Sequence, residues 1–305
     1  MIAFTLFLAS LAGSALTAAL PPSSVFTNPA EALIARATGD NKGGGNGNTQ
    51  WIKDIPIHES CNNSQRLQIE RGFKELYTVS QAAADDIYRH GNTSELFKTY
   101  FGSEADPAVP IGIYERIING DKTGTLFRCD DPDRNCETQP TYFGHWRGSN
   151  ATGETVICEN TFQGRKSIEA ACGFGFQLAR DNVNTFLGLD FLHRLLHLPT
   201  ITNELVNHVA DNYTDVLELA RTNATFSVRN QHSIQNFAFE VWTRANIDPN
   251  GCVGEPAPES EDDDDDTSGQ ATPSASATTS APTTTSTGVS GQDCHSHADG
   301  SIHCV

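Results

Sequence analysis

The stretch that decides the fold reads Phe191-Leu192-His193-Arg194-Leu195-Leu196-His197. Its apolar residues predict a buried helix, and residues four apart on a helix lie on the same face. Two imidazoles at that spacing can bind one zinc ion. In the motif H-E-x-x-H, a glutamate after the first histidine takes a proton from the metal-bound water. Arg194 stands at that place and stays protonated, so the stretch predicts a zinc site without a general base.

A third protein ligand is expected, because zinc sites with an open position use three. His208 is the leading candidate, on a helix predicted over 203–221, and Asp211 is the runner-up. Two histidines four residues apart also occur by chance. The alternative to a zinc site is therefore a pair of helix-face histidines that pack beside the core. The residues alone leave the third ligand open.

The chain ends in a second cluster of candidate metal ligands, in which two cysteines enclose three histidines. Imidazoles at this spacing can bind zinc, copper or nickel. When oxidised, Cys294 and Cys304 would form a disulfide around the histidines, and when reduced they would be thiolate ligands. The alternative is a flexible tail with incidental histidines. The three histidines are His295, His297 and His303.

Composition divides the chain into segments of different character. The uncharged apolar start is typical of a secretory signal, and a late segment rich in Pro, Ser, Thr and Asp cannot bury enough apolar surface to fold. The expected segments are a signal peptide at 1–19, a disordered segment at 20–50, a zinc-binding domain at 51–253, an acidic and then Ser/Thr/Pro-rich linker at 254–292, and a metal-binding tail at 293–305.

The charge of the chain limits its partners. The formal net charge is -18 at pH 7 over 305 residues. So acidic a chain repels nucleic acid and anionic membranes and attracts cations. No segment after the signal is long and apolar enough to span a bilayer. We expect no nucleic-acid partner and no membrane insertion, while an oligomer is compatible with the sequence.

Cysteines and glycosylation sequons indicate export. The eight cysteines are an even number, which fits full pairing in an oxidising compartment. Beyond the tail pair, the spacing of the other six does not choose among their many pairings. We therefore expect a glycoprotein that is secreted, either extracellular or cell-wall associated. The sequons begin at Asn62, Asn92, Asn150, Asn212 and Asn223.

Apolar periodicity predicts an α+β domain dominated by helices, with a small sheet. The helices are expected at 64–89, 96–101, 111–118, 177–196, 203–221 and 233–244, and the strands at 141–146 and 154–159.

Three features together resemble the fungal zincophore, or pH-regulated antigen, family, which includes a fibrinogen-binding mould allergen. They are the histidine motif at 193–197, the stretch Asn207-His208-Val209-Ala210-Asp211 and the Cys-His-x-His ending. The domain is more distantly similar to deuterolysin-type zinc metalloproteases. This resemblance implies a zincin-like, disulfide-stapled fold. It also implies the pairs Cys61 with Cys129, Cys136 with Cys158 and Cys172 with Cys252.

The same resemblance implies a function outside the cell. It implies capture of extracellular zinc, return of the ion to a plasma-membrane zinc transporter, and contact with host fibrinogen and complement proteins as part of virulence. Three hypotheses follow. The first is a zinc scavenger without peptidase activity, the second a residual metallopeptidase that uses Asp190 or Glu204 as its base, and the third a wall-associated adhesin or immune-evasion antigen.

Overall fold

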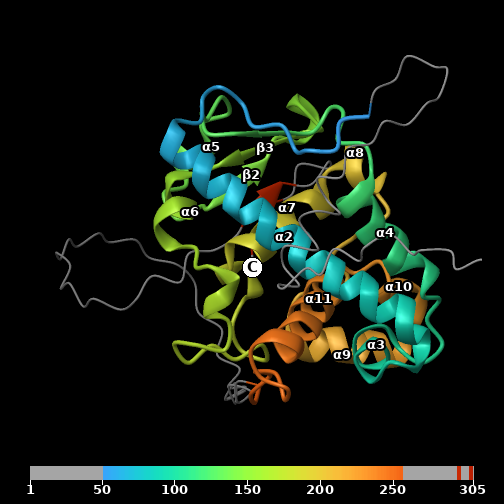
Figure 1. Ribbon diagram of the computed structural model, residues 1–305. Helices are drawn as coiled ribbons and strands as arrows, with labels where there is room; N and C mark the ends of the chain where they lie inside the picture. Colours follow the sequence, from blue (N-terminus) through green and yellow to red (C-terminus); the bar gives the residue numbers. More distant parts are fainter. Residues whose placement is uncertain (1–50, 257–293, 297–301, 305) are drawn as a thin grey trace, which may run out of the picture.

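The computed structural model describes residues 51–256, 294–296 and 302–304 (Figure 1). The expected signal peptide, the segment at 20–50, nearly all of the linker at 254–292 and His297 lie outside the described residues. The helix-dominated α+β architecture with a small sheet is confirmed. The longer helices are α2 (Asn63–His90), α3 (Glu95–Phe101), α4 (Ala108–Asn119), α7 (Leu187–His197), α9 (Tyr213–Thr222) and α11 (Gln231–Asn246). The short ones are α5 (Asn135–Thr138), α6 (Glu159–Gly164), α8 (Pro199–Thr202) and α10 (Ala224–Ser227).

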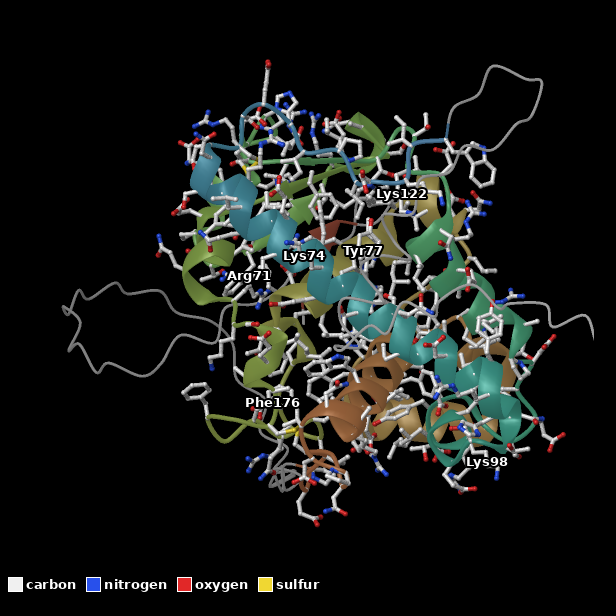
Figure 2. All side chains as sticks on the ribbon, in the orientation of Figure 1. Arg71, Lys74, Tyr77, Lys98, Lys122 and Phe176 are labelled. Atoms are coloured by element: carbon white, nitrogen blue, oxygen red, sulfur yellow. A yellow bond between two sulfur atoms is a disulfide. The ribbon has the colours of Figure 1, made fainter. Side chains whose placement is uncertain are left out.

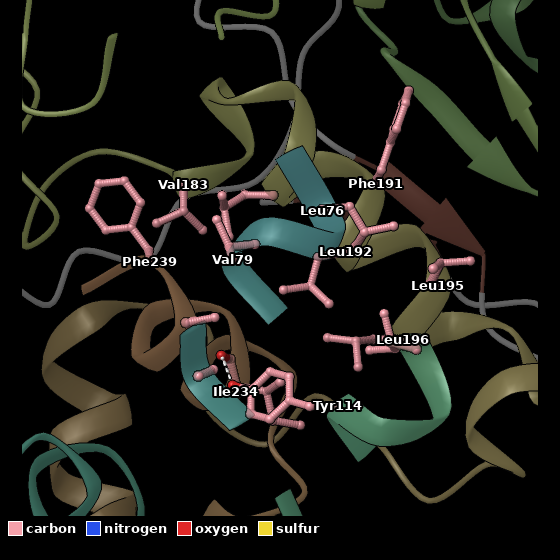
Figure 3. Packing of buried hydrophobic residues seen from close by; sticks show 14 of the residues in the cluster. Leu76, Val79, Tyr114, Val183, Phe191, Leu192, Leu195, Leu196, Ile234 and Phe239 are labelled. Carbon is pink, nitrogen blue, oxygen red and sulfur yellow. Dashed lines mark hydrogen bonds between the residues drawn. The ribbon is translucent and has the colours of Figure 1, made fainter. Parts of the chain in front are cut away.

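Helix α2 is the centre of the fold. It crosses the molecule and packs against α4, α7 and α11 (Figure 1). Figure 3 shows Leu192 of α7 beside Leu76 and Val79 of α2, and all three side chains are fully buried. Deep burial on both helices makes this contact the main apolar support of α7. In the same cluster, the Tyr114 hydroxyl donates to the carbonyl of Ile234 at 2.6 Å.

Two glycines let α2 and α7 approach closely. A methyl group on Gly72 of α2 would lie 2.4 Å from the ring of Phe191. A methyl group on Gly188 of α7 would lie 2.5 Å from Cβ of Glu75. Neither contact is sterically possible without movement, so the spacing between the two helices depends on glycine at both places.

Glu75 of α2 anchors the beginning of α7. Its Oε2 accepts hydrogen bonds from the backbone N–H groups of Gly188 and Ile168, both at 3.2 Å, and its Oε1 accepts from the Ser167 hydroxyl at 2.7 Å. The first N–H groups of a helix have no partner within the helix, so this carboxylate acts as a cap supplied from another element. Burial raises the pKa of Glu75 above its usual value despite these hydrogen bonds.

A buried lysine closes the end of α4 in a similar way. Lys122, labelled in Figure 2, is fully buried and donates to the carbonyls of Arg116 and Gly120, both at 2.8 Å. Burial lowers the pKa of Lys122 to about 8. The two carbonyls at the end of the helix therefore receive a charged donor.

The sheet has three strands in the order β1-β3-β2. Strand β1 (Leu126–Arg128) runs parallel to β3 (Glu154–Ile157), and β2 (Gly144–Trp146) runs antiparallel to it. Strand β2 is thus an edge strand, and it lies beside α7. A separate hairpin of β4 (Cys294–Ser296) and β5 (Ile302–Cys304) lies next to β2.

Three disulfides staple the domain. The structure pairs Cys61 with Cys129, Cys136 with Cys158 and Cys172 with Cys252, the pairing that the family resemblance implied. The first joins the start of α2 to the end of β1, and the second joins α5 to the residue after β3. Among the described residues, no helix has the length and apolar character needed to cross a bilayer.

Two predicted helices are wrong in part. The helix expected over 177–196 begins only at Leu187, because 177–186 forms turns and a short 3-10 helix, Val183–Thr185. There the Asp181 carboxylate accepts from the backbone N–H of Gln177, and the Asn182 side chain accepts from that of Asn184. Such local bonds compete with a regular helix.

The helix expected over 203–221 begins ten residues late, at Tyr213. Asn203 and Glu204 have positive φ angles of 52° and 59°, which end α8 and turn the chain. The backbone of Asn207 then pairs with Arg229 and Gln231 instead of its neighbours. His208 and Asp211 consequently lie on a loop. Strand β1 was not predicted.

Candidate metal centre

Helix α7 supplies the first two histidines. The ring centroids of His193 and His197 lie 4.7 Å apart, one helical turn from each other. His193 is 4% exposed, and the leucines around the pair are almost fully buried. Because both ends of the motif are on one rigid, packed helix, the distance between the two rings is fixed.

His208 reaches the same place from the loop between α8 and α9. Asn230 holds this loop: its Oδ1 accepts from the backbone N–H groups of Val209 and Ala210 at 2.9 and 3.1 Å, and its Nδ2 donates to the Ala210 carbonyl at 3.0 Å. The rings of His208 and His197 stack with 4.7 Å between centroids, and their Nε2 atoms are 2.9 Å apart. Two nitrogens bound to one tetrahedral zinc lie about 3.4 Å apart, so this pair already has nearly the spacing of two zinc ligands.

Asp211 stands behind His208. Its Oδ1 lies 3.0 Å from His208 Nδ1, on the side of the ring away from His197. A carboxylate on Nδ1 holds the proton there and leaves Nε2 free for a metal, an arrangement common around zinc. Between the two candidates for the third ligand, the structure thus places His208 toward the cluster and Asp211 against its far nitrogen.

The cluster contains a fourth histidine, His232, which the sequence analysis did not single out. His232, in the first turn of α11, is 5% exposed, and its ring centroid lies 5.7 Å from that of His208 and 6.5 Å from that of His193. Its Nε2 is 3.6 Å from Asp211 Oδ1. The available signal was its place one residue before the helix predicted over 233–244. With only ten histidines in the chain, four in one cluster is a strong concentration.

Arg194 forms a buried ion pair with Asp190. Its guanidinium donates to both carboxylate oxygens of Asp190, one turn earlier, at 3.2 and 2.9 Å. Arg165 adds a second guanidinium 3.5 Å from Asp190, and all three side chains are nearly completely buried. Asp190 is therefore committed to two cations and cannot serve as a free general base. Glu204, the other base considered, is exposed in the turn after α8.

Arg194 also fills the space between α7 and the sheet. A methyl group on Gly144 of β2 would lie 2.4 Å from Arg194 Nη1 and 2.3 Å from the Val156 carbonyl oxygen. Residue 194 is thus a packing element beneath the edge strand.

The described tail residues form the β4–β5 hairpin. Its register sets Cys294 opposite Cys304 and His295 opposite His303. The hairpin lies beside β2, the strand that also contacts α7.

A further group of candidate ligand atoms, from Asp131, Cys136 and His145, lies near the sheet. The sulfur of Cys136 is bonded to Cys158 and is no thiolate. His145 is 1% exposed, and burial lowers its pKa, while its Nε2 faces Asp131 at 3.2 Å. This group is a buried polar contact of the disulfide-bonded loop.

The donor set of the histidine cluster fits zinc. Imidazole nitrogens suit zinc, copper, iron and nickel, and four of them in a buried cluster backed by a carboxylate match a tetrahedral zinc site. Ligand atoms of His208, Asp211 and His232 lie within 4.8 Å of one another, and the rings of His193 and His197 lie beside them. The four histidines would hold the ion, while Asp211 lies on the far nitrogen of His208. All four ligand positions would then come from the protein.

Comparison with known proteins adds a family. The family model described as "HRXXH: Putative peptidase family" matches residues 7–255 of this chain. Antigen 1 of Emericella nidulans is 42% identical over 252 residues, covering 82% of this chain and 88% of that protein. The major allergen Asp f 2 of Aspergillus fumigatus is 42% identical over 205 residues, 67% of this chain and 66% of the allergen, just under two thirds of its length.

The pH-regulated antigen PRA1 of Candida albicans is 34% identical over 231 residues, covering 75% of this chain and 77% of that protein. Among solved structures, a zinc peptidase from Grifola frondosa matches with a TM-score of 0.44 and 12% identity, over 59% of this chain and 97% of that chain.

Proposed function

This chain belongs to the HRXXH family, and we propose that it is a secreted zinc-binding protein that captures zinc outside the cell and does not cleave peptides. The resemblance to the pH-regulated antigen family is confirmed by the matches to the allergen and to PRA1. The observation that carries the proposal is the convergence of four imidazoles in a motif where Arg194, held by Asp190, stands at the place of the catalytic glutamate.

The number of ligands separates binding from catalysis. A catalytic zinc keeps one position open for water, whereas a site with four protein ligands is closed. We propose His232 as the fourth ligand because its ring lies 5.7 Å from that of His208. The place of the catalytic glutamate is taken by Arg194, which is held by Asp190. Both features act against hydrolysis: one removes the water, and the other removes the group that would activate it.

Capture must be followed by release if the ion is cargo. Protons compete with zinc for imidazole nitrogens, so a cluster made of histidines releases the ion on acidification. We propose that the receiver is a zinc transporter at the cell surface. The tail supplies a second, more labile site, in which His295 and His303 lie at opposed positions of the hairpin and a Cys294–Cys304 disulfide would hold its ends.

Metal analysis of the full-length protein tests the proposal. Zinc per chain is measured by mass spectrometry after equilibrium dialysis, for the native chain and for a variant with His193 and His197 replaced by alanine. We expect the variant to lose one zinc per chain while the tail site remains. Unchanged zinc content would count against the domain site. Casein cleavage that a chelator abolishes would overturn the non-enzymatic assignment.

The names of the relatives favour a second, compatible role as a surface antigen. Proteins called allergen and antigen are 34–42% identical to this chain. We propose contact with host proteins such as fibrinogen and complement factors. Fibrinogen binding that persists in metal-free protein supports this role, and its absence in both zinc-loaded and metal-free protein rejects it.

A further inference from the structure

Three buried amide side chains surround one nitrogen of His193. Asn184 comes from the 3-10 turn before α7, and Gln231 and Gln235 come from the first turns of α11. All three are completely buried. Asn184 Nδ2 lies 3.3 Å from His193 Nδ1, and Gln231 Nε2 is also in hydrogen-bond contact with Nδ1.

The orientation of these amides is set by a backbone carbonyl. Gln235 Nε2 lies 2.9 Å from the carbonyl oxygen of Leu189, which can only accept, so the NH₂ group of Gln235 must face it. The same NH₂ group donates to Asn184 Oδ1 at 2.8 Å, and Gln235 Oε1 accepts from Gln231 Nε2. It follows that Asn184 and Gln231 both turn N–H groups toward His193.

An orphaned oxygen supports this orientation. Gln231 Oε1 is buried and has no hydrogen-bond partner among the described residues. Rotating the Gln231 amide by half a turn would set its oxygen against Gln235 Oε1, two acceptors in contact. The chain of amides therefore keeps its direction even though one buried oxygen is left without a donor, which is unusual in proteins.

We infer that Asn184, Gln231 and Gln235 are positioning residues that hold His193 with its proton on Nε2, and that this weakens His193 as a zinc ligand. This inference rests on the proposed zinc function. A neutral imidazole binds a metal through the nitrogen that lacks the proton. For zinc to bind Nε2 of His193, the proton must move to Nδ1, where it meets two N–H groups.

His208 shows the opposite arrangement. Its Nδ1 faces the carboxylate of Asp211 at 3.0 Å, which favours a proton on Nδ1 and leaves Nε2 ready for metal. The site therefore combines a ligand prepared for zinc with one whose surroundings oppose zinc. Such a combination lowers affinity while keeping four ligands, which suits an ion that must be released.

The tautomer of His193 can be measured directly in metal-free, full-length protein. Nitrogen-15 NMR of the ring distinguishes protonated from unprotonated Nδ1 and Nε2, and spectra of the His193→Ala and His208→Ala variants assign the signals. We expect His193 to carry its proton on Nε2 and His208 on Nδ1. A proton on Nδ1 of His193 would overturn the inference, whether or not the protein binds zinc.

Affinity provides the second test. In Asn184→Asp, one carboxylate oxygen still accepts from Gln235 while the other offers His193 Nδ1 an acceptor in place of a donor. We expect zinc to bind about tenfold more tightly, the scale of effects at residues that hold metal ligands. Asn207→Asp is the matched control, because it adds the same charge next to His208 without contacting His193. Both are made in chains whose tail histidines are alanine.

The outcomes separate the two ideas. Equal zinc affinities for Asn184→Asp and Asn207→Asp would show that charge alone matters, and the inference would fall. Absence of zinc uptake by the native chain would remove the proposed function while the NMR result on His193 still stands. Should Asn184→Asp not fold, the tautomer measured in the native chain decides.

Discussion

The Nε2 atoms of His197 and His208 face each other at 2.9 Å, although the two residues come from a buried helix and from a separate loop. Two such nitrogens are compatible with a shared proton or with a shared metal ion. The rings of His193 and His232 lie next to His208 as well. A shared metal ion, as proposed above, would account for the position of all four rings, whereas a shared proton would account for only two.

His232→Ala tests whether the fourth ring is a ligand. We expect zinc affinity to fall by about 100-fold or more, as for His208→Ala, because a tetrahedral site loses one of its protein ligands. Isothermal titration in chains with alanine at the tail histidines measures the effect. His90→Ala is the control, since His90 is exposed at the end of α2 and should leave affinity unchanged. Native affinity in His232→Ala would reduce the site to three ligands.

Prediction from the sequence succeeded where the chemistry is local. His193 and His197 are one turn apart on one helix, and their spacing in the sequence is their spacing in space. The main helix over 64–89 was also predicted to within one residue at each end, because its apolar residues recur at helical spacing along its length.

The parts that were missed depend on contacts between distant segments. The loop carrying His208 is shaped by backbone bonds from Asn207 to Arg229 and Gln231, which no local pattern encodes. His232 and the two glutamines reach the site only because α11 packs against α2 and α7. A single sequence shows the residue types but not this packing, so the place of His232 in the cluster and the amides around His193 could not be predicted.

Gly144→Ala tests the contact between the edge strand and Arg194. The added methyl group would meet the Arg194 guanidinium and the Val156 carbonyl at less than 2.5 Å, so β2 must shift away from α7. We expect a loss of about 1–3 kcal/mol in the free energy of unfolding, measured by chemical denaturation.

Gly112→Ala is the matched control for this substitution. Gly112 lies in the exposed interior of α4, and a methyl group there has nothing within 4 Å. Alanine favours a helix over glycine, so stability should stay the same or rise by up to about 1 kcal/mol. Equal stabilities of the two variants would show that β2 is not held tightly against Arg194.

Glu75→Gln tests the buried cap of α7 through its pH dependence. The pKa of Glu75 is raised in the folded state, so between pH 4.5 and that raised value the folded protein binds more protons than the unfolded chain. The contribution of Glu75 to stability therefore falls as pH rises through this window. Glutamine can keep all three hydrogen bonds, with Oε1 accepting from the two backbone N–H groups and Nε2 donating to Ser167.

We accordingly expect Glu75→Gln to gain stability relative to the native chain on going from pH 4.5 to pH 8, as measured by denaturation at several pH values. Glu70→Gln, at an exposed position of the same helix, should follow the native curve. A constant difference between Glu75→Gln and the native chain across this range would mean that the carboxylate does not titrate as its burial implies.

Arg194→Glu tests whether restoring a glutamate at position 194 is sufficient for peptidase activity. The substitution recreates the H-E-x-x-H motif, but it sets a second buried carboxylate beside Asp190 and leaves Arg165 as the remaining partner near both. Removing one member of a buried ion pair typically destabilises by about 3–5 kcal/mol, and a like charge in its place adds to that loss. We therefore expect a large drop in the free energy of unfolding and no chelator-sensitive cleavage of casein.

Arg194→Lys separates charge from geometry in this experiment. Lysine keeps the positive charge but cannot bind both oxygens of Asp190 as the planar guanidinium does, so it should be destabilised less than Arg194→Glu. If Arg194→Glu instead folds as well as Arg194→Lys and cleaves casein in the presence of zinc, the fourth histidine does not close the site. In that case one residue alone would decide between binding and hydrolysis. If the four histidines fill the coordination of a bound zinc ion, glutamate at position 194 has no bound water to activate. It also stands beside Asp190, which then keeps Arg165 as its one arginine partner among the described residues.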